Sequence, residues 1–242
     1  MNTNSNSYTF LFSLAMVVVV GALLAFAAVS TKERIAQNVK LEKMQNILST
    51  VGIEVERDLA EGKYKEIIKE ELSLKSDGSV DENTDAFTVD LAKELKKPVD
   101  EQRFPLYIAE NNGKTFYIIP LRGAGLWDAI WGYLSLSEDL NTVTGAVFDH
   151  KGETPGLGAE ITTDWFESQF KNEKIFNESG ELTGIAVVKG NNDPSGTRKN
   201  DNAVDAISGA TITGDGVTKM IQERLSHYLN YIKNHSSSLA LK

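Results

Sequence analysis

Near the C-terminal end, the small residues Ser208-Gly209-Ala210-Thr211 present a threonine hydroxyl that a bulky group could reach. Gly209 and Ala210 leave room for such a group to approach the backbone, because neither carries a large side chain. Asp205 stands three positions before Ser208, which gives the pattern Asp-x-x-Ser-Gly-Ala-Thr. The same four small residues are also compatible with an ordinary turn that leads into a helix.

A helix is predicted directly after this run, with Thr213 or Asp215 as its N-cap. Apolar residues then recur at helical spacing through about residue 234: Val217, Ile221, Leu225, Tyr228 or Leu229, and Ile232. An anionic group held just ahead of this helix would meet unpaired backbone N–H groups and the positive end of the helix dipole.

The pattern from Asp205 to Thr211 matches a sequence for covalent flavin attachment at every fixed position. The chain resembles the FMN-binding domain of two related membrane redox complexes, the C subunit of sodium-translocating NADH:quinone reductases and the G subunit of RNF electron-transport complexes. Its length, the segment after an apolar N-terminal run and Glu153-Thr154-Pro155-Gly156-Leu157-Gly158 resemble the sodium-pump protein over nearly the whole chain. The RNF protein shares the attachment motif and remains the alternative.

The resemblance implies that FMN is joined to the hydroxyl of Thr211 through a phosphoester bond. It also implies an electron carrier within a sodium-pumping NADH:ubiquinone oxidoreductase, with other subunits and a flavin transferase as partners and no catalytic acid or base on this chain. A membrane-anchored scaffold without flavin is the alternative from another class. The residues expected around the attachment end are Asp205, Ser208, Gly209, Ala210 and Thr213.

Two further segments are similar to recurrent motifs of the family, Gly123-Ala124-Gly125-Leu126-Trp127 and the segment 153–158. Glycines beside an aromatic residue let a flat ring lie against the backbone, and Pro155 and Gly156 set a tight turn whose amides could bind a flavin edge. A core tryptophan in a bent connection and an ordinary loop explain the same residues. The residues expected around the ring are Leu126, Trp127, Thr154, Gly156 and Leu157.

The elements that must position these residues are mostly strands. Asn111-Asn112-Gly113-Lys114 is typical of a β-hairpin turn. Strands are predicted at 106–109, 115–119, 132–136, 142–149 and 181–188, and a short helix within 163–170. Strands with few helices and no strict βαβ alternation indicate an α+β domain around an antiparallel sheet.

Residues 10–29 form an uncharged, largely apolar run that as a helix spans the ~30 Å hydrocarbon core of a bilayer. A cleaved signal peptide is the competing interpretation, since Ala25-Phe26-Ala27 resembles a cleavage site. The run is longer than the usual apolar region of about 7–15 residues, however, and the leader 1–9 has no Lys or Arg. We therefore expect a retained, single-pass transmembrane helix.

The orientation of this helix is indicated in opposite directions by charge and by family. Lys32, Arg34, Lys40 and Lys43 follow the apolar run, so the positive-inside rule alone places the large domain in the cytoplasm. The resemblance implies a bacterial inner-membrane protein with a periplasmic domain. Because long translocated domains can escape the rule, we expect the extracytoplasmic orientation.

Beyond the anchor, apolar residues spaced three to five apart predict an amphipathic connecting helix at 30–52, followed by one FMN-binding α+β domain at 53–242. The strongly charged stretch 54–97 predicts a solvated helical face and then a variable loop. A polar loop at 190–202 is expected to pass the flavin site.

Composition excludes several classes of function. The chain has 25 Lys plus Arg against 34 Asp plus Glu, a net charge of −9, which disfavours nucleic-acid binding. It has no cysteine, so it cannot ligate an iron–sulfur cluster or form disulfides. Its three histidines lack metal-ligand spacing, and no metal site is expected. No Gly-x-Gly-x-x-Gly follows a strand, so NADH is expected to be oxidised elsewhere.

Overall fold

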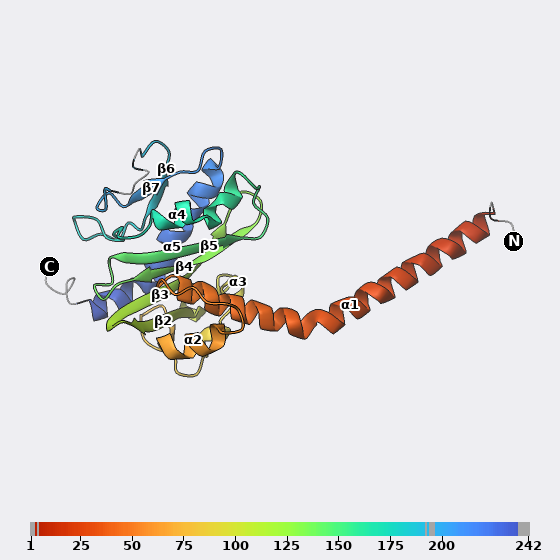
Figure 1. The fold of residues 1–242 in the computed structure, drawn as a ribbon, viewed down its shortest axis with the longest axis horizontal. Coiled ribbons are helices and arrows are strands. Elements are labelled where there is room, and N and C mark those ends of the chain that lie inside the picture. Colours follow the sequence, from red (N-terminus) through yellow and green to blue (C-terminus); the bar gives the residue numbers. More distant parts are fainter. Residues whose placement is uncertain (1–2, 4, 192, 194–196, 237–242) are drawn as a thin grey trace. The chain divides into compact units, whose positions relative to one another are not determined.

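The computed structural model describes residues 3, 5–191, 193 and 197–236. The chain divides into two units, residues 1–43 and 44–242. Helix α1 (Asn6–Ser49) supplies the first unit, and its final residues, from Met44, belong to the second (Figure 1). The helix continues without a break through residues 29 and 30, so the predicted membrane and connecting segments share one helix.

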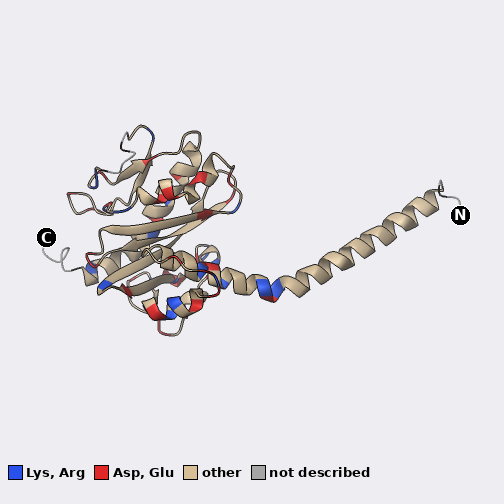
Figure 2. Ribbon diagram, in the orientation of Figure 1, with Lys and Arg blue, Asp and Glu red and all other residues tan. Residues whose placement is uncertain are grey.

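Within the described residues, α1 is the one helix long and apolar enough to cross a membrane. Its 44 residues exceed the ~20 that a bilayer requires, and none of its most apolar window is buried in the protein. Figure 2 shows the first basic and acidic residues of α1 well inside the helix, after the apolar segment. The part of α1 before Lys32 therefore lacks charged side chains among the described residues.

The second unit is built on a five-stranded antiparallel sheet in the order β1-β2-β3-β4-β5 (Figure 1). The strands are β1 (Ile68–Leu74), β2 (Phe104–Asn111), β3 (Lys114–Ala124), β4 (Ala129–Leu136) and β5 (Val143–His150). Asn112 and Gly113 join β2 to β3 with φ of 52° and 73°, the positive values that an Asn-Gly hairpin turn requires. The predicted antiparallel sheet and its hairpin are confirmed.

Two predictions about individual elements are wrong. The charged stretch 54–97 contains a helix, α2 (Ala60–Ile67), but also the edge strand β1, whose exposed residues 69–71 are all charged. Charges on an edge strand hinder pairing with another chain. Here the same charges are the reason why the strand was not predicted from the sequence. The strand predicted at 181–188 is reduced to β6 (Ala186–Val188), because Gly184 has a φ of 67°. β6 pairs in parallel with β7 (Ala203–Asp205).

Helix α5 (Thr211–His235) packs along β3 and against β6, and it covers one face of the sheet. The predicted apolar positions Val217, Ile221 and Leu225 are fully buried in this core. The predicted short helix is α4 (Asp164–Ser168), and its Phe166 stands 5.7 Å, between ring centroids, from Phe148 of β5. The shorter elements are η1 (Ala86–Thr88), α3 (Leu91–Glu94), η2 (Val99–Glu101) and η3 (Gly158–Thr162).

The other face of the sheet is covered by α2, η1 and the last turn of α1. Tyr107 of β2 donates from its hydroxyl to the carbonyl of Ala86 at 3.3 Å, and Ile47 and Leu48 of α1 are fully buried. Both faces of the sheet are therefore covered. The β3–β4 turn and the segment after β5 lie at one end of the sheet, outside these covered faces. Of the predicted loop 190–202, residues 192 and 194–196 lie outside the described residues.

Candidate functional site

Three segments that are distant in sequence meet at the carboxylate of Glu153. Oε2 of Glu153 accepts a hydrogen bond from the hydroxyl of Thr213, in the first turn of α5, at 2.6 Å. Oε1 accepts from the backbone N–H of Trp127, in the turn between β3 and β4, at 2.9 Å. The segment after β5 therefore joins the β3–β4 turn to the start of α5, and the three motifs noted in the sequence form one site.

Thr211 is the first residue of α5 and is exposed. The N-cap position is taken by Ala210, so the predicted cap at Thr213 or Asp215 is wrong. Gly209 has a φ of 78° and turns the chain into the helix earlier than expected, while the Thr213 hydroxyl binds Glu153 instead of the backbone. The hydroxyl of Thr211 consequently stands on the helix terminus itself.

The start of α5 has unused hydrogen-bond donors. Within the described residues, the backbone N–H groups of Thr211, Ile212 and Thr213 donate no hydrogen bond, and the first turn contains no acidic side chain. The N–H of Gly214 is the first to bond within the helix, to the carbonyl of Ala210 at 2.9 Å. Free N–H groups at the positive end of a helix dipole attract an anion such as a phosphate.

Exposed apolar side chains lie on all three segments. Trp127 is 68 % exposed and Ile212 is 58 % exposed, and Leu126 and Leu157 are also largely open to solvent. Leu157 packs onto Gly209, where a Cβ atom would lie only 2.7 Å from Leu157 Cδ2. Clustered exposed apolar groups of this kind mark a surface that binds a ligand or a partner.

The turn after β5 is braced internally. The indole Nε1 of Trp127 donates to the hydroxyl of Thr154 at 3.2 Å. The N–H of Gly156 donates to the carboxylate of Glu160 at 2.8 Å, and that of Leu157 donates to the Thr154 carbonyl at 3.1 Å. Two of the turn amides that were expected to bind a flavin edge are thus already paired within the loop.

The remaining expected residues lead into the site from β7. Asp205 is half-buried at the end of β7, and its N–H donates to the side-chain oxygen of Gln169 at 2.9 Å. Ser208 and Gly209 are exposed, and the N–H of Ala210 donates to the carbonyl of Ile207 at 3.1 Å. These residues form a tight, surface turn that places Thr211 at the helix start.

Glu153 is the residue of this site that sequence reasoning did not single out. Its own segment was noted, but its two partners lie 26 and 60 positions away, and no local pattern reveals such contacts. Although burial raises the pKa of Glu153, the hydrogen bonds from Thr213 and from the backbone at Trp127 hold it below its usual value. The side chain is therefore a charged carboxylate at neutral pH.

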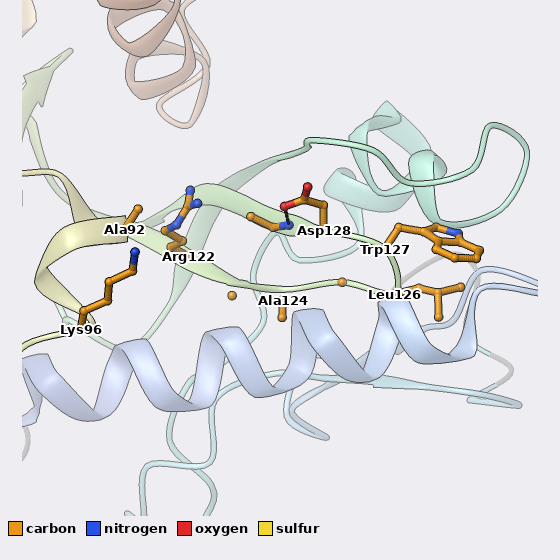
Figure 3. A pocket seen from close by; sticks show the side chains of 10 residues that line it. Ala92, Lys96, Arg122, Ala124, Leu126, Trp127 and Asp128 are labelled. Atoms are coloured by element: carbon orange, nitrogen blue, oxygen red, sulfur yellow. Dashed lines mark hydrogen bonds between the residues drawn. The ribbon is translucent and has the colours of Figure 1, made fainter.

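A cleft with a volume of about 430 Å³ adjoins the β3–β4 turn. In Figure 3, Leu126 and Trp127 lie at one end of the cleft and Arg122 and Lys96 at the other, above α5. Asp128 also lines the cleft; it forms an ion pair with Lys151 at 2.8 Å, and the charge of Arg122 helps to lower its pKa. The cleft thus extends from the apolar side chains of Leu126 and Trp127 to the basic side chains of Arg122 and Lys96.

Comparisons with known proteins converge on one family. The model of the family described as "FMN-binding domain" matches residues 125–226, which contain all three segments of the site. The chain is 30 % identical, over 91 % of both chains, to the C subunit of the Na(+)-translocating NADH-quinone reductase of Pseudomonas aeruginosa. It is 40 % identical to the corresponding protein of Chlamydia muridarum over 50 % of this chain and 42 % of that one.

Two solved structures are similar in fold. The crystal structure of the C subunit of the Na(+)-translocating NADH-quinone reductase from Parabacteroides distasonis matches with a TM-score of 0.74 and 41 % identity, covering 83 % of this chain and 96 % of that one. Shewanella oneidensis NqrC matches with a TM-score of 0.67 and 25 % identity, covering 81 % and 98 %. The chain therefore belongs to the family formed by the C subunits of the Na(+)-translocating NADH-quinone reductases.

Proposed function

We propose that this protein is an electron-carrier subunit of a sodium-translocating NADH:quinone reductase and that it holds FMN covalently on Thr211. The observation that carries the proposal is the exposed hydroxyl of Thr211 on a helix terminus with three free N–H groups. Family membership supports the FMN and the multi-subunit complex. The covalent bond is inferred from the attachment pattern between Asp205 and Thr211.

The residues at the site fit a flavin phosphate and ring. The free N–H groups of Thr211 and Ile212 would hold the phosphate, and Ser208, Gly209 and Ala210 leave it open space. Leu126, Trp127 and Leu157 offer an apolar surface of the kind that a flat ring covers, and Thr154 fixes the indole of Trp127. Thr213 acts through Glu153 instead of on the phosphate, because its hydroxyl is buried.

Bound FMN would supply the redox chemistry, since a flavin accepts and releases electrons. The protein's part is to retain it, to orient it and to leave it open to a partner. A phosphoester on Thr211 retains the cofactor through every redox cycle, and the exposed side chains around it leave the carrier accessible. No acid or base on this chain is needed for that task.

We further propose the arrangement of the chain in the cell. Residues 10–29 cross the bacterial inner membrane once, residues 30–52 connect, and residues 53–242 form the flavin domain on the periplasmic side. An apolar, unburied N-terminal helix in a family of membrane-complex subunits supports the single-pass anchor. Periplasmic placement would let an exported flavin transferase reach Thr211, and other subunits would exchange electrons with the domain.

Covalent attachment is tested on the full-length chain, coexpressed with a flavin transferase. We expect the denatured wild-type band to fluoresce in a gel, and the peptide that contains Thr211 to carry the mass of FMN less one water. Thr211→Val should abolish both signals because it removes the acceptor oxygen. Ser226→Ala, which removes an exposed hydroxyl farther along α5, should change neither.

Two results would contradict the proposal. Fluorescence that persists in Thr211→Val would move the attachment to another residue. A colourless wild-type protein that carries no flavin mass would favour the scaffold alternative.

A further inference from the structure

The carboxylate of Glu153 is enclosed on both sides by glycines. A Cβ atom at Gly125 would lie 2.5 Å from Oε1, and one at Gly158 would lie 2.4 Å from Oε2. At either position an added Cβ atom would force the carboxylate to move, so glycine lets the backbone approach it this closely. Glu153 is only 4 % exposed, which makes this a built, buried contact rather than a surface ion.

Each oxygen of Glu153 binds a different part of the site, and we call these two parts, the β3–β4 turn and the first turn of α5, its walls. Oε1 fixes the turn that carries Leu126 and Trp127, and Oε2 fixes the first turn of α5, two residues after Thr211. The adjacent Thr154 then holds the indole of Trp127. Removal of the carboxylate would leave the Trp127 N–H without its partner and would leave the Thr213 hydroxyl unpaired in a buried place, which is costly.

We infer that Glu153 is a positioning residue of the flavin site: it holds the Leu126–Trp127 wall against the start of α5, and its negative charge lowers the reduction potential of the flavin on Thr211. This inference rests on the function proposed above. The effect on the potential follows from charge, since reduction adds electrons to the flavin and a nearby anion disfavours that addition. The free N–H groups of α5 stay available because Glu153 uses both of its oxygens elsewhere.

Glutamine separates the two roles of Glu153. In Glu153→Gln the side-chain oxygen can still accept from the Trp127 N–H, and the new NH₂ can donate to the hydroxyl of Thr213, which is free to rotate. The walls should remain in place while the charge is lost. We therefore expect Glu153→Gln to incorporate flavin at nearly the wild-type rate, with a midpoint potential shifted upward.

Glu153→Ala and Thr213→Val remove the link itself. We expect Thr213→Val to lower the initial rate of flavin incorporation about tenfold, the factor that corresponds to one lost hydrogen bond to a charged group, and Glu153→Ala to lower it at least as much because it removes two such bonds. Thr213→Ser restores the hydroxyl and should recover most of the rate. Asp81→Asn is the control for Glu153→Gln, because Asp81 is also a buried carboxylate; it accepts hydrogen bonds from the side chains of Arg103 and Thr84 and from one backbone N–H.

The measurements are the in-gel flavin fluorescence against time and the redox titration of the full-length chain in detergent. An incorporation rate in Glu153→Ala within twofold of wild type, or in Thr213→Val if the alanine variant does not fold, would overturn the positioning role. A midpoint potential in Glu153→Gln equal to or below that of wild type would overturn the electrostatic role. Absence of flavin from wild type itself would instead refute the proposed function.

Discussion

A carboxylate and free backbone N–H groups lie close together at the start of α5, but the carboxylate does not occupy the N–H groups. Glu153 directs its oxygens to the Thr213 hydroxyl and to the β3–β4 turn, and both are fully used there. The N–H groups of Thr211 and Ile212 remain free on the exposed side of the same turn. The charge of Glu153 thus stabilises the fold around the site, while the helix dipole stays available to a phosphate.

Glu167 of α4 gives the domain a pH-dependent stability. Burial raises the pKa of this carboxyl to about 7, even though it accepts a hydrogen bond from the N–H of Phe148 at 2.7 Å. A raised pKa means that the folded state binds the proton more tightly than the unfolded chain, whose value is near 4.5. The contribution of Glu167 is therefore fully present below about pH 4.5 and is lost as the pH rises through 7.

We predict that the melting temperature of the full-length protein in detergent falls as the pH rises between 5 and 8, and that Glu167→Gln makes this decline shallower, because the amide does not titrate. Tryptophan fluorescence during heating measures both. Glu110→Gln, at an exposed position on β2, is the control and should keep the wild-type slope. An unchanged slope in Glu167→Gln would contradict the prediction.

At the level of elements, the sequence predicts those helices and strands that are determined by residues close together in the chain. The hairpin of β2 and β3 follows from Asn112-Gly113, and the buried face of α5 follows from its helical spacing. β1 could not be predicted, because it is a strand only by pairing with β2, whose partner residues lie 30 to 41 positions later, and because its exposed residues are charged.

The candidate site shows the same division. Thr211 and its small neighbours could be proposed from the sequence because they are contiguous. Glu153 was not found as a link, because its function is to join residues that only the folded sheet brings together. The helix start was misplaced by the strong capping tendency of Thr213 and Asp215, which a tertiary contact at Thr213 overrides.

Helix α5 can cross β3 closely because Gly216 has no side chain. A Cβ atom at Gly216 would lie 2.4 Å from the carbonyl oxygen of Ala124, so the backbones are too close for alanine. We predict that Gly216→Ala destabilises the domain by about 1–3 kcal/mol, as overpacking does, and slows flavin incorporation by moving the helix start. Thermal unfolding and in-gel fluorescence measure the two effects.

Gly62→Ala is the matched control, for which we expect a gain in stability instead of a loss. Gly62 lies inside α2, where an added Cβ meets nothing within 4 Å, so alanine should stabilise by about 0.5–1 kcal/mol and leave the flavin unaffected. Equal stability of the two variants would show that the close contact between α5 and β3 at Gly216 does not affect the stability of the domain.

For the whole molecule, the side of the membrane on which the flavin domain lies can be tested because the chain has no cysteine. We predict that a single cysteine introduced as Lys65→Cys, at an exposed position of α2, reacts with a membrane-impermeant maleimide in intact spheroplasts. Asn6→Cys, at the other end of the anchor, should react only after lysis. Labelling in the reverse pattern would place the domain in the cytoplasm, as Lys32 and Arg34 alone would favour.

The role of the molecule in its complex is tested by interrupting electron transfer at one point. A carrier in series with other cofactors must limit every electron that reaches the quinone, but it has no part in oxidation of NADH at an earlier subunit. Thr211→Val in the assembled enzyme should therefore strongly reduce NADH-to-quinone turnover and leave NADH oxidation by an artificial acceptor nearly intact. The isolated wild-type subunit should be reduced by dithionite but not by NADH, since its sequence has no nucleotide-binding fingerprint. Full quinone reduction by a complex verified to lack flavin on this subunit would show that electrons bypass Thr211 and that the domain serves the complex as a scaffold.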